Sequence, residues 1–329
     1  MTKFRAFQID NKDNQIIGAL KALNISDLCE GDVTIKVTHS TINYKDALAA
    51  TGMGKILRKF PLIGGIDLAG EVTSSSADEI KIGDQVLVNG CGLSETRDGG
   101  YAEIARVHKD AIIHIPNNMN AHQVMQIGTA GYTAALAINN MEHNGQTPEA
   151  GPILVTGATG GVGSMAINML ASKGYEVVAL TSKTDKLNYL ENIGASEVLI
   201  RDDLDHGKRP LEKAVWGGAI DNLGGETLTW LTRTLKYGGN IACIGLAASH
   251  KLETTVIPLI LRGINLLGIN SVDTPLVLRK RVWERIGDDL FPKDIDLIAP
   301  KIINFDDLPN AFNAYIDGSV SGRVVVKIQ

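Results

Sequence analysis

The sequence is short of the residues that build metal sites and disulfide frameworks. Its 329 residues include only three cysteines, Cys29, Cys91 and Cys243, with no CxxC spacing. An odd number of widely spaced cysteines favours neither a disulfide framework nor a compact zinc site. Seven histidines are scattered without an HExxH pair, and such histidines are more often structural or solvated than metal ligands. We therefore predict that the protein holds no metal.

Excess positive charge and long apolar stretches are lacking too. A net charge of −5 at pH 7 argues against a sequence-independent nucleic-acid binder, which needs clustered Lys and Arg to meet phosphates. We interpret the basic cluster 279–281 as a solvated helix face. The apolar stretch 256–269 is interrupted by Arg262 and Asn265 and is too short to span a membrane. The amino terminus has no apolar signal core. These features predict a cytoplasmic protein whose partners are neither nucleic acids nor membranes.

What the sequence does contain is a change of periodicity near residue 126. Before it, short runs such as VTIKVTHS and DQVLVNG lie between Gly, Asp and Ser residues, which is typical of a β-rich domain. After it, strand-like runs alternate with helical ones, as in βαβ units around a mostly parallel sheet. The chain returns to short pieces after about residue 296 and ends on SGRVVVKI, a strand that could rejoin the first sheet. We predict an α/β protein with a discontinuous β-rich domain, 1–125 and 296–329, and a doubly wound dinucleotide-binding domain, 126–295.

A glycine-dense turn follows the first strand of the second predicted domain. From Ala158 it reads A-x-G-G-V-G, between a strand-like run and an amphipathic helical run. Gly160 and Gly161 would let the backbone approach a pyrophosphate, and Gly163 would let the helix pack closely on the sheet. The helix start would offer free N–H groups to the anion. A glycine-rich turn without a ligand is the alternative, but the strand–turn–helix context favours a dinucleotide.

The acid that would mark an NAD site is missing about 20 residues further on. The strand-like run EVVAL leads to Thr181, Ser182 and Lys183, where an Asp or Glu would bind the ribose of NAD. Hydroxyl donors and an ammonium would instead bind the 2′-phosphate of NADP through charge-assisted hydrogen bonds. Arg201, at the end of the next strand-like run, could add a second cation. These residues favour NADPH over NADH as the cofactor.

Eight segments spread along nearly the whole chain match the pattern of a known group of proteins. They are HSTINYKDALAATG (39–52), FPLIGGIDLAGEV (60–72), IGTAGYTAAL (127–136), ATGGVGS (158–164), LEKAVWGGAIDNLGG (211–225), CIGLA (243–247), LILRGINLLGINSV (259–272) and SGRVVVKI (321–328). Together they resemble the zinc-free medium-chain dehydrogenase/reductase superfamily, and within it the acryloyl-CoA reductase branch of quinone-oxidoreductase-like proteins. The resemblance implies a GroES-like amino-terminal domain, a Rossmann domain, and a cleft where the nicotinamide meets the substrate. Zinc enzymes of the superfamily carry a Cys near Asn43, a GHE motif at 65–67 and a four-cysteine lobe, all of which this sequence lacks.

The resemblance also implies roles for particular side chains. Tyr44 would line the nicotinamide end of the cofactor and, with Asn43 beside it and Arg323 as a distant candidate, would supply hydrogen-bond donors to the substrate. Lys183 is commonly an arginine in relatives, a change that keeps the charge but weakens a bidentate grip on phosphate. The implied cofactor-binding positions are Tyr44, Thr133, Gly160, Gly161, Val162, Gly163, Thr181, Ser182, Lys183, Arg201, Asn222, Leu246, Ile260 and Ser271.

The resulting hypothesis is metal-free reduction of an activated C=C bond by NADPH. Hydride would reach the β-carbon, donors would stabilise the developing enolate, and a proton would reach the α-carbon. Tyr44 would position the carbonyl or donate that proton; packing against the nicotinamide ring is the alternative. The favoured substrate is an α,β-unsaturated acyl-CoA such as acryloyl-CoA. The alternatives are a quinone or enone reductase, which would use the same cleft, and a non-catalytic NADPH-binding protein.

A homodimer is the assembly that the resemblance implies. It would form by pairing the predicted edge strand INLLGIN (264–270) with its copy. An apolar, uncovered edge strand invites such pairing.

Overall fold

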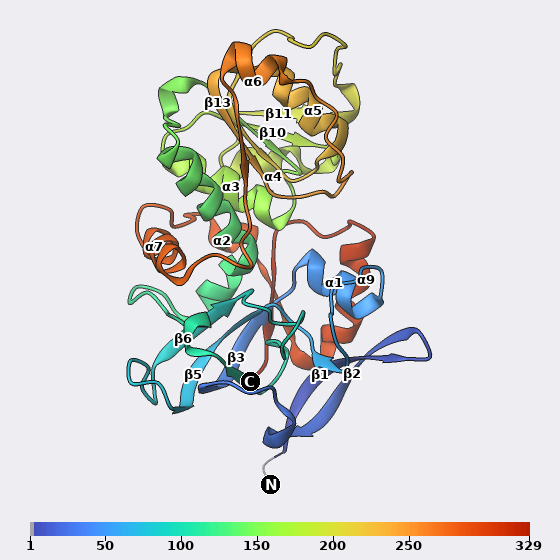
Figure 1. The fold of residues 1–329 in the computed structure, drawn as a ribbon, viewed down its shortest axis with the longest axis vertical. Helices are drawn as coiled ribbons and strands as arrows, with labels where there is room; N and C mark the ends of the chain where they lie inside the picture. Colours follow the sequence, from blue (N-terminus) through green and yellow to red (C-terminus); the bar gives the residue numbers. More distant parts are fainter. Residues whose placement is uncertain (1–2) are drawn as a thin grey trace. The chain divides into compact units, whose positions relative to one another are not determined.

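The computed structural model describes residues 3–329, which form two compact units (Figure 1). Unit 1 contains the chain up to Thr129 together with Val272–Gly287 and Ala299–Gln329, and unit 2 contains Ala130–Ser271 and Asp288–Ile298. The combination of a β-rich unit and a doubly wound unit confirms the predicted fold class.

Unit 1 is built around two sheets. The smaller has the order β2 (Gln15–Asn24), β1 (Lys3–Lys12), β4 (Leu62–Ile63). The larger has the order β15 (Lys301–Asn304), β16 (Val324–Lys327), β3 (Val33–Thr41), β5 (Asp67–Ser75), β6 (Gln85–Asn89), β8 (Ile113–His114), and β7 (Ile104–Val107) also pairs with β3. The carboxyl-terminal strand β16 pairs antiparallel with β3, with Val326 opposite Ser40. The expectation that the last strand rejoins the first sheet is therefore confirmed.

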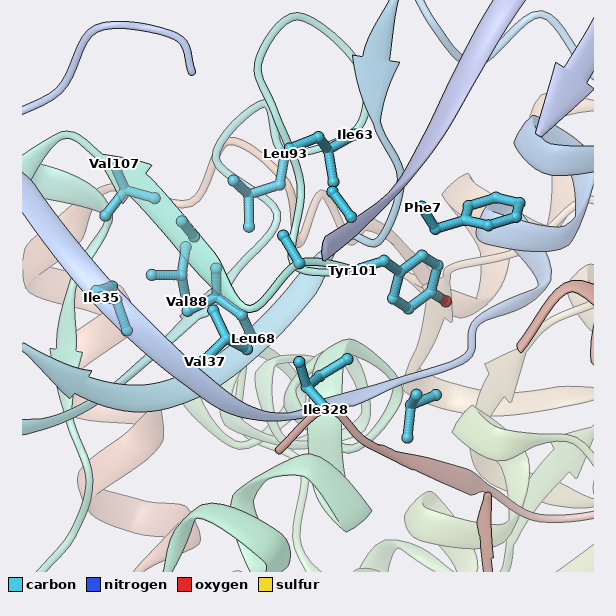
Figure 2. Close-up of a cluster of buried hydrophobic side chains, with 14 of the residues drawn as sticks. Phe7, Ile35, Val37, Ile63, Leu68, Val88, Leu93, Tyr101, Val107 and Ile328 are labelled. Atoms are coloured by element: carbon cyan, nitrogen blue, oxygen red, sulfur yellow. The ribbon is translucent and has the colours of Figure 1, made fainter. Parts of the chain in front are cut away.

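The core of unit 1 follows from the alternation of these strands. Val33, Ile35 and Val37 of β3 all point inward and are fully buried, because successive side chains of a strand face opposite sides. Figure 2 shows Ile35 and Val37 beside Leu68, Val88 and Ile328, with the ring of Tyr101 near Phe7. Burial of this much apolar surface is the main stabilisation of the unit.

Four α-helical segments belong to the described part of unit 1. They are α1 (Tyr44–Thr51), the first part of α2 (Ala121–His143), α7 (Leu276–Ile286) and α9 (Leu308–Ile316). Helix α2 is broken at Gly128, whose φ of 51° and ψ of −161° are not helical. A Cβ at this glycine would lie 2.4 Å from the Arg323 guanidinium and 2.7 Å from Thr41. The break therefore requires glycine, both for its backbone angles and for space.

The position of α7 differs from the predicted domain boundary, which assigned residues 272–287 to the dinucleotide-binding domain. Trp283 is buried in unit 1, where its indole donates a hydrogen bond of 3.0 Å to Asn89. Arg279 is only 2% exposed and donates to the carbonyls of Val272 and Thr274 and to the Cys91 sulfur. The interpretation of cluster 279–281 as a solvated helix face is therefore wrong for Arg279, although its two neighbours in the cluster are exposed.

Unit 2 is a six-stranded parallel sheet of the doubly wound kind. Its order is β11 (Glu197–Ile200), β10 (Val177–Thr181), β9 (Ile153–Thr156), β12 (Trp216–Asp221), β13 (Leu235–Cys243), β14 (Asn265–Gly268). The second part of α2, α3 (Gly161–Ser172), α4 (Leu187–Asn192), α5 (Gly225–Thr234), α6 (Val256–Arg262) and the short α8 (Ile295–Ile298) belong to this unit. The strand order reverses beside β9, and ligands of such sheets bind at the carboxyl ends of the strands at that point.

Candidate functional site

The turn between β9 and α3 has the shape of a phosphate-binding cradle. A Cβ at Gly163 would lie 2.4 Å from the Gly157 carbonyl and 2.8 Å from the Ala158 Cα, so the close packing of α3 on the turn requires glycine there. A Cβ at Gly160 would meet only the Gly157 carbonyl, at 3.3 Å, and Gly160 is exposed. The turn thus uses Gly163 for packing inside the protein and leaves Gly160 open to a ligand.

The start of α3 offers its backbone donors to that ligand. Gly160 is the N-cap residue and has no side chain to bond to the first N–H groups of this 12-residue helix. Uncapped N–H groups and the positive end of the helix dipole favour an anion. Val162, in the first turn, is partly exposed. The residues from Gly160 to Gly163 therefore suit the pyrophosphate of a dinucleotide.

The carboxyl ends of β10 and β11 bring hydroxyl and cationic groups together. Thr181 lies opposite Ile200 in the parallel ladder, so Ser182, Lys183 and Arg201 follow neighbouring strand ends. Ser182 is exposed, and the half-buried Lys183 donates its backbone N–H to the Thr181 hydroxyl at 3.0 Å. Partial burial lowers the pKa of the Lys183 ammonium. Arg201 contacts Asp202 at 3.2 Å, so a phosphate would have to compete with this exposed carboxylate.

Asn222 holds the end of β12 against the end of β9. Its amide donates to the Thr156 carbonyl at 2.7 Å, and its backbone N–H donates to the Thr156 hydroxyl at 2.9 Å. The fully buried Asp221 accepts from the same hydroxyl and from the backbone of Gly224, at 2.7 and 2.8 Å. Burial raises the pKa of the Asp221 carboxyl, and these hydrogen bonds oppose that rise. Asn222 therefore lies beside the glycine turn, and Thr156 and Asp221, which sequence reasoning missed, fix it there.

The remaining cofactor positions predicted in unit 2 lie on different elements. Thr133 is buried on α2, and Leu246 is exposed after β13. Ile260 is exposed on α6, a helix that packs against β13, and Ser271 is half-buried after β14. Their roles stay predictions.

In unit 1, the predicted donor Tyr44 is the first residue of α1 and is 52% exposed. Asn43 precedes it as the N-cap residue, and its backbone and side-chain N–H groups both donate to Asp46, at 2.9 and 3.0 Å. The Asp46 backbone N–H donates in return to the Asn43 carbonyl at 3.0 Å, and such reciprocal bonding fixes the first turn of a helix. Tyr44 therefore lies at a capped helix start with about half of its surface exposed.

A buried polar network lies behind this helix start and is centred on Asp67, which is fully buried. One Asp67 oxygen accepts from Asn89 at 2.6 Å and from the Thr129 hydroxyl at 2.5 Å. The other accepts from the Asn43 amide at 2.7 Å and from the Thr129 backbone at 3.0 Å. Four donors satisfy a buried carboxylate well. Both Thr129 bonds come from the residue that follows the break at Gly128, so they also hold the backbone at that break.

Arg323 closes the network from the opposite end of the chain. It is 3% exposed, and its guanidinium donates to the Asn43 side-chain oxygen at 3.0 Å and to the Thr41 hydroxyl at 2.8 Å. Two further bonds reach the carbonyls of Ile42 and Gln126. Asn43 and Arg323 are therefore joined to each other at the start of α1, and both are buried.

The second buried carboxylate of this region, Asp46, is weakly acidic. Desolvation, followed by the negative charge of Asp67, raises the pKa of Asp46 to about 7, and its hydrogen bonds from Asn43 and Ile66 oppose the rise.

Sequence reasoning missed Asp67, Thr129 and the break at Gly128. The sequence could have shown Asp67, because a lone charged residue in the apolar run LIGGIDLAG requires buried partners.

The described residues contain no metal cluster and no membrane helix. Between residues 3 and 329, no three or more His, Cys, Asp or Glu side chains are grouped so that they could hold a metal ion. In the same part of the chain, every helix is too short or too polar to cross a membrane.

Comparisons with known families agree with both units. The model of the family described as alcohol dehydrogenase GroES-like domain matches residues 29–117. The model of the family described as zinc-binding dehydrogenase matches residues 161–286.

Individual relatives match the whole chain. The acrylyl-CoA reductase AcuI of Ruegeria pomeroyi is 43% identical over 321 residues, covering 97% of both chains. The putative quinone oxidoreductase YhfP of Bacillus subtilis is 42% identical over 328 residues, covering 99% of both, and a solved structure of YhfP has NAD bound. The crystal structure of Escherichia coli K-12 YhdH with bound NADPH has a TM-score of 0.95 and 43% identity, and covers 98% of this chain and 100% of that one.

Proposed function

This chain belongs to the medium-chain dehydrogenase/reductase superfamily, in the branch of the acrylyl-CoA reductase AcuI and the quinone oxidoreductase YhfP, and from that premise we propose that it reduces the C=C bond of an α,β-unsaturated acyl-CoA with NADPH. Acryloyl-CoA is the first substrate to test. The observation that carries the proposal is the uncapped glycine turn before α3 with hydroxyls and a lysine, in place of an acid, after the neighbouring strand.

The cofactor fits the residues of unit 2. When bound, NADPH supplies the hydride for the β-carbon of the substrate. Residues 160–163 would hold its pyrophosphate, and Ser182, Lys183 and Arg201 its 2′-phosphate. A carboxylate after β10 would repel that phosphate, whereas two cations favour it.

Tyr44 is the proposed donor to the substrate. Its hydroxyl is on an exposed ring at a fixed helix start, so it can bond to the carbonyl oxygen on which negative charge grows. It would either stabilise that oxygen or deliver the proton for the α-carbon.

Asn43 and Arg323 act in this proposal as positioning residues. Both are buried and bonded to one another and to neighbouring groups of unit 1. They would hold the first turn of α1, and with it the Tyr44 backbone, in one place, because preorganised donors need no rearrangement during the reaction.

A quinone or enone reductase is the second candidate, favoured by the 42% identity to YhfP. The test is to measure NADPH oxidation with acryloyl-CoA, crotonyl-CoA and a benzoquinone side by side. We expect the highest kcat/KM with acryloyl-CoA. A clear preference for the quinone would replace the first proposal by the second, and tight NADPH binding without turnover on any acceptor would make the protein a non-catalytic NADPH binder.

The homodimer is also part of the proposal. Strand β14 is the last in the order of its sheet, and the neighbouring helix α6 exposes Val256, Ile260 and Leu261. Exposed apolar side chains beside an open strand edge suit pairing with a second copy. Light scattering should give twice the chain mass of 35.2 kDa, and Leu261→Glu should shift the protein toward the monomer. A monomeric wild type would contradict this assembly.

A further inference from the structure

The segment that follows α1 carries positive charge that the proposed mechanism does not use. Residues 55–59 include Lys55, Arg58 and Lys59, all exposed, and no acid. Exposed cations without acids near a proposed active-site helix suit an anionic part of a ligand. The segment is part of unit 1, as Tyr44 is.

Backbone contacts fix both ends of this segment. The Gly54 N–H donates to the Leu48 carbonyl at 3.2 Å, and a Cβ on Gly54 would lie 3.0 Å from the Leu48 Cβ. Further on, the Arg58 N–H donates to the Glu95 carbonyl at 2.7 Å. The Glu95 carboxylate in turn pairs with Lys45, the residue after Tyr44. Lys55 therefore follows a bend that packs on the end of α1, and the Arg58 backbone is tied to Glu95, the partner of Lys45.

The acids of this region are already neutralised. Glu95 is paired with Lys45, and Asp46 is buried and bonded to Asn43 and Ile66. Between residues 3 and 329, no carboxylate pairs with Lys55 or Arg58 in the structure. Both cations are therefore available to a ligand.

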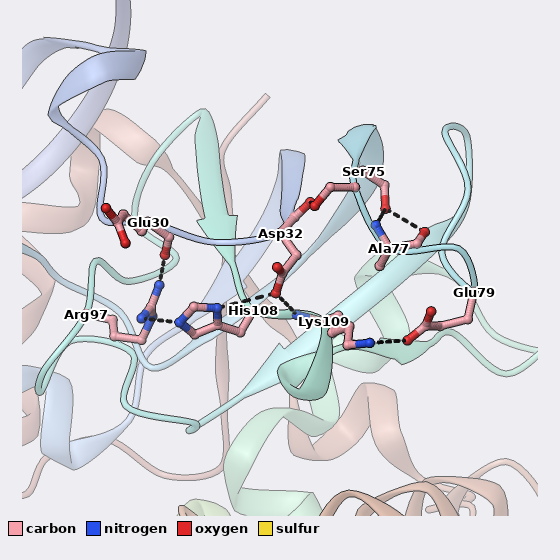
Figure 3. Close-up of polar contacts among 9 residues, drawn as sticks. Glu30, Asp32, Ser75, Ala77, Glu79, Arg97, His108 and Lys109 are labelled. Carbon is pink, nitrogen blue, oxygen red and sulfur yellow. Dashed lines mark hydrogen bonds and ion pairs between the residues drawn. The ribbon is translucent and has the colours of Figure 1, made fainter.

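Neighbouring cations differ from these two. The Lys59 ammonium lies 3.7 Å from the Cys29 sulfur, in a pocket that also contains Asp27 and Asp98. Arg97 donates to the Glu30 carbonyl and contacts His108 at 2.7 Å, as Figure 3 shows. Lys59 and Arg97 thus have polar surroundings of their own, and the unneutralised charge is concentrated on Lys55 and Arg58.

We propose that Lys55 and Arg58 bind the phosphates of the CoA part of the substrate. This rests on the proposed function, in which Tyr44 meets the thioester carbonyl. The pantetheine arm of CoA separates that carbonyl from the phosphates, so a phosphate site would lie on the surface of unit 1 apart from Tyr44. Met53, which is 68% exposed between α1 and Lys55, gives that arm an apolar surface. The guanidinium of Arg58 suits bidentate contact with a phosphate, and Lys55 adds a point charge.

The test uses the NADPH-saturated enzyme and two substrates that differ only in their phosphates and adenosine. Lys55→Ala/Arg58→Ala should raise the KM for acryloyl-CoA at least about tenfold at low salt, with a similar kcat, because two charge-assisted hydrogen bonds are lost. The KM for acryloyl-pantetheine and the KM for NADPH should not change. The increase should shrink as salt is added. The matched control is Lys36→Ala/Lys81→Ala, which removes two exposed lysines elsewhere in unit 1.

Three results would overturn the proposal: an unchanged KM for acryloyl-CoA, an equal rise in the KM for acryloyl-pantetheine, or a rise in the KM for NADPH. Calorimetry with free CoA separates this inference from the proposed function. If the wild type reduces neither thioester but binds CoA, and the double variant does not bind it, the function fails and the phosphate site stands. A wild type that does not bind CoA contradicts the site directly.

Discussion

At the scale of single residues, the exposed Tyr44 begins a helix whose first turn is held by buried polar side chains. Tyr44 begins α1, and Asn43, Asp46, Asp67 and Arg323 lie at this helix start with their polar atoms bonded to one another or to backbone groups. A network in which each member is satisfied holds one conformation, whereas a partly satisfied one is costly. In the proposed function, Tyr44 would therefore contact the substrate, and the buried side chains would hold Tyr44 in position.

The hydroxyl of Tyr44 is testable on its own. Tyr44→Phe keeps the ring and removes one donor, so kcat with acryloyl-CoA should fall about 100-fold, as for loss of an oxyanion donor. The Kd for NADPH should be unchanged. Tyr237→Phe, at a highly exposed tyrosine of unit 2, is the control and should leave kcat unaltered. Equal turnover in Tyr44→Phe would leave Tyr44 only a packing role.

The buried Asp46 predicts how stability depends on pH. Its pKa is raised from 3.8 to about 7 in the folded protein, so the folded state retains a proton that the unfolded chain releases. The stability contributed by this group is complete below about pH 4 and is lost as the pH rises toward 7.

Asp46→Asn imitates the protonated carboxyl and removes this titration. In urea unfolding, the wild type should lose stability relative to Asp46→Asn between about pH 4 and pH 7. The same pH dependence in both proteins would show that Asp46 is ionised throughout this range.

At the scale of elements, the sequence was most informative where local chemistry decides the structure. The strand–turn–helix of β9 and α3 could be predicted because its glycines, its apolar run and its helical period coincide in one segment. The break in α2 could not, because 121–143 keeps a helical pattern on both sides of Gly128 and only the contacts with Arg323 and Thr41 show why the backbone departs there. Tertiary contacts of this kind leave no periodic pattern in a single sequence.

The two roles of glycine in the cradle can be separated by substitution. Gly163→Ala adds a methyl group against the Gly157 carbonyl and should destabilise unit 2 by about 1–3 kcal/mol, the usual cost of overpacking. Gly160→Ala adds a methyl group that faces outward, so stability to urea should hold while the Kd for NADPH rises. Loss of stability in Gly160→Ala, with NADPH affinity retained, would mean that Gly160 serves packing instead.

At the scale of the whole molecule, the chain returns to unit 1 twice. The return of 299–329 could be predicted from its short pieces and final strand, and β16 pairs with β3 as expected. The return of 272–287 could not, because the amphipathic pattern of α7 would fit either unit, and only the buried Trp283 and Arg279 decide between them. The cations of 55–59 were missed for a related reason: three charges in a loop look like ordinary surface until the structure shows that the nearby acid, Glu95, is paired with Lys45.

Coenzyme preference tests most directly whether unit 2 holds NADPH for a reduction. We predict that the wild type reduces acryloyl-CoA with a kcat/KM at least about 100-fold higher for NADPH than for NADH, because the 2′-phosphate gains charge-assisted hydrogen bonds. Ser182→Asp/Lys183→Ala should reverse the preference. A wild type that uses NADH as well as NADPH, or a double variant that still prefers NADPH, would contradict the assignment of the phosphate to the edge formed by Ser182 and Lys183.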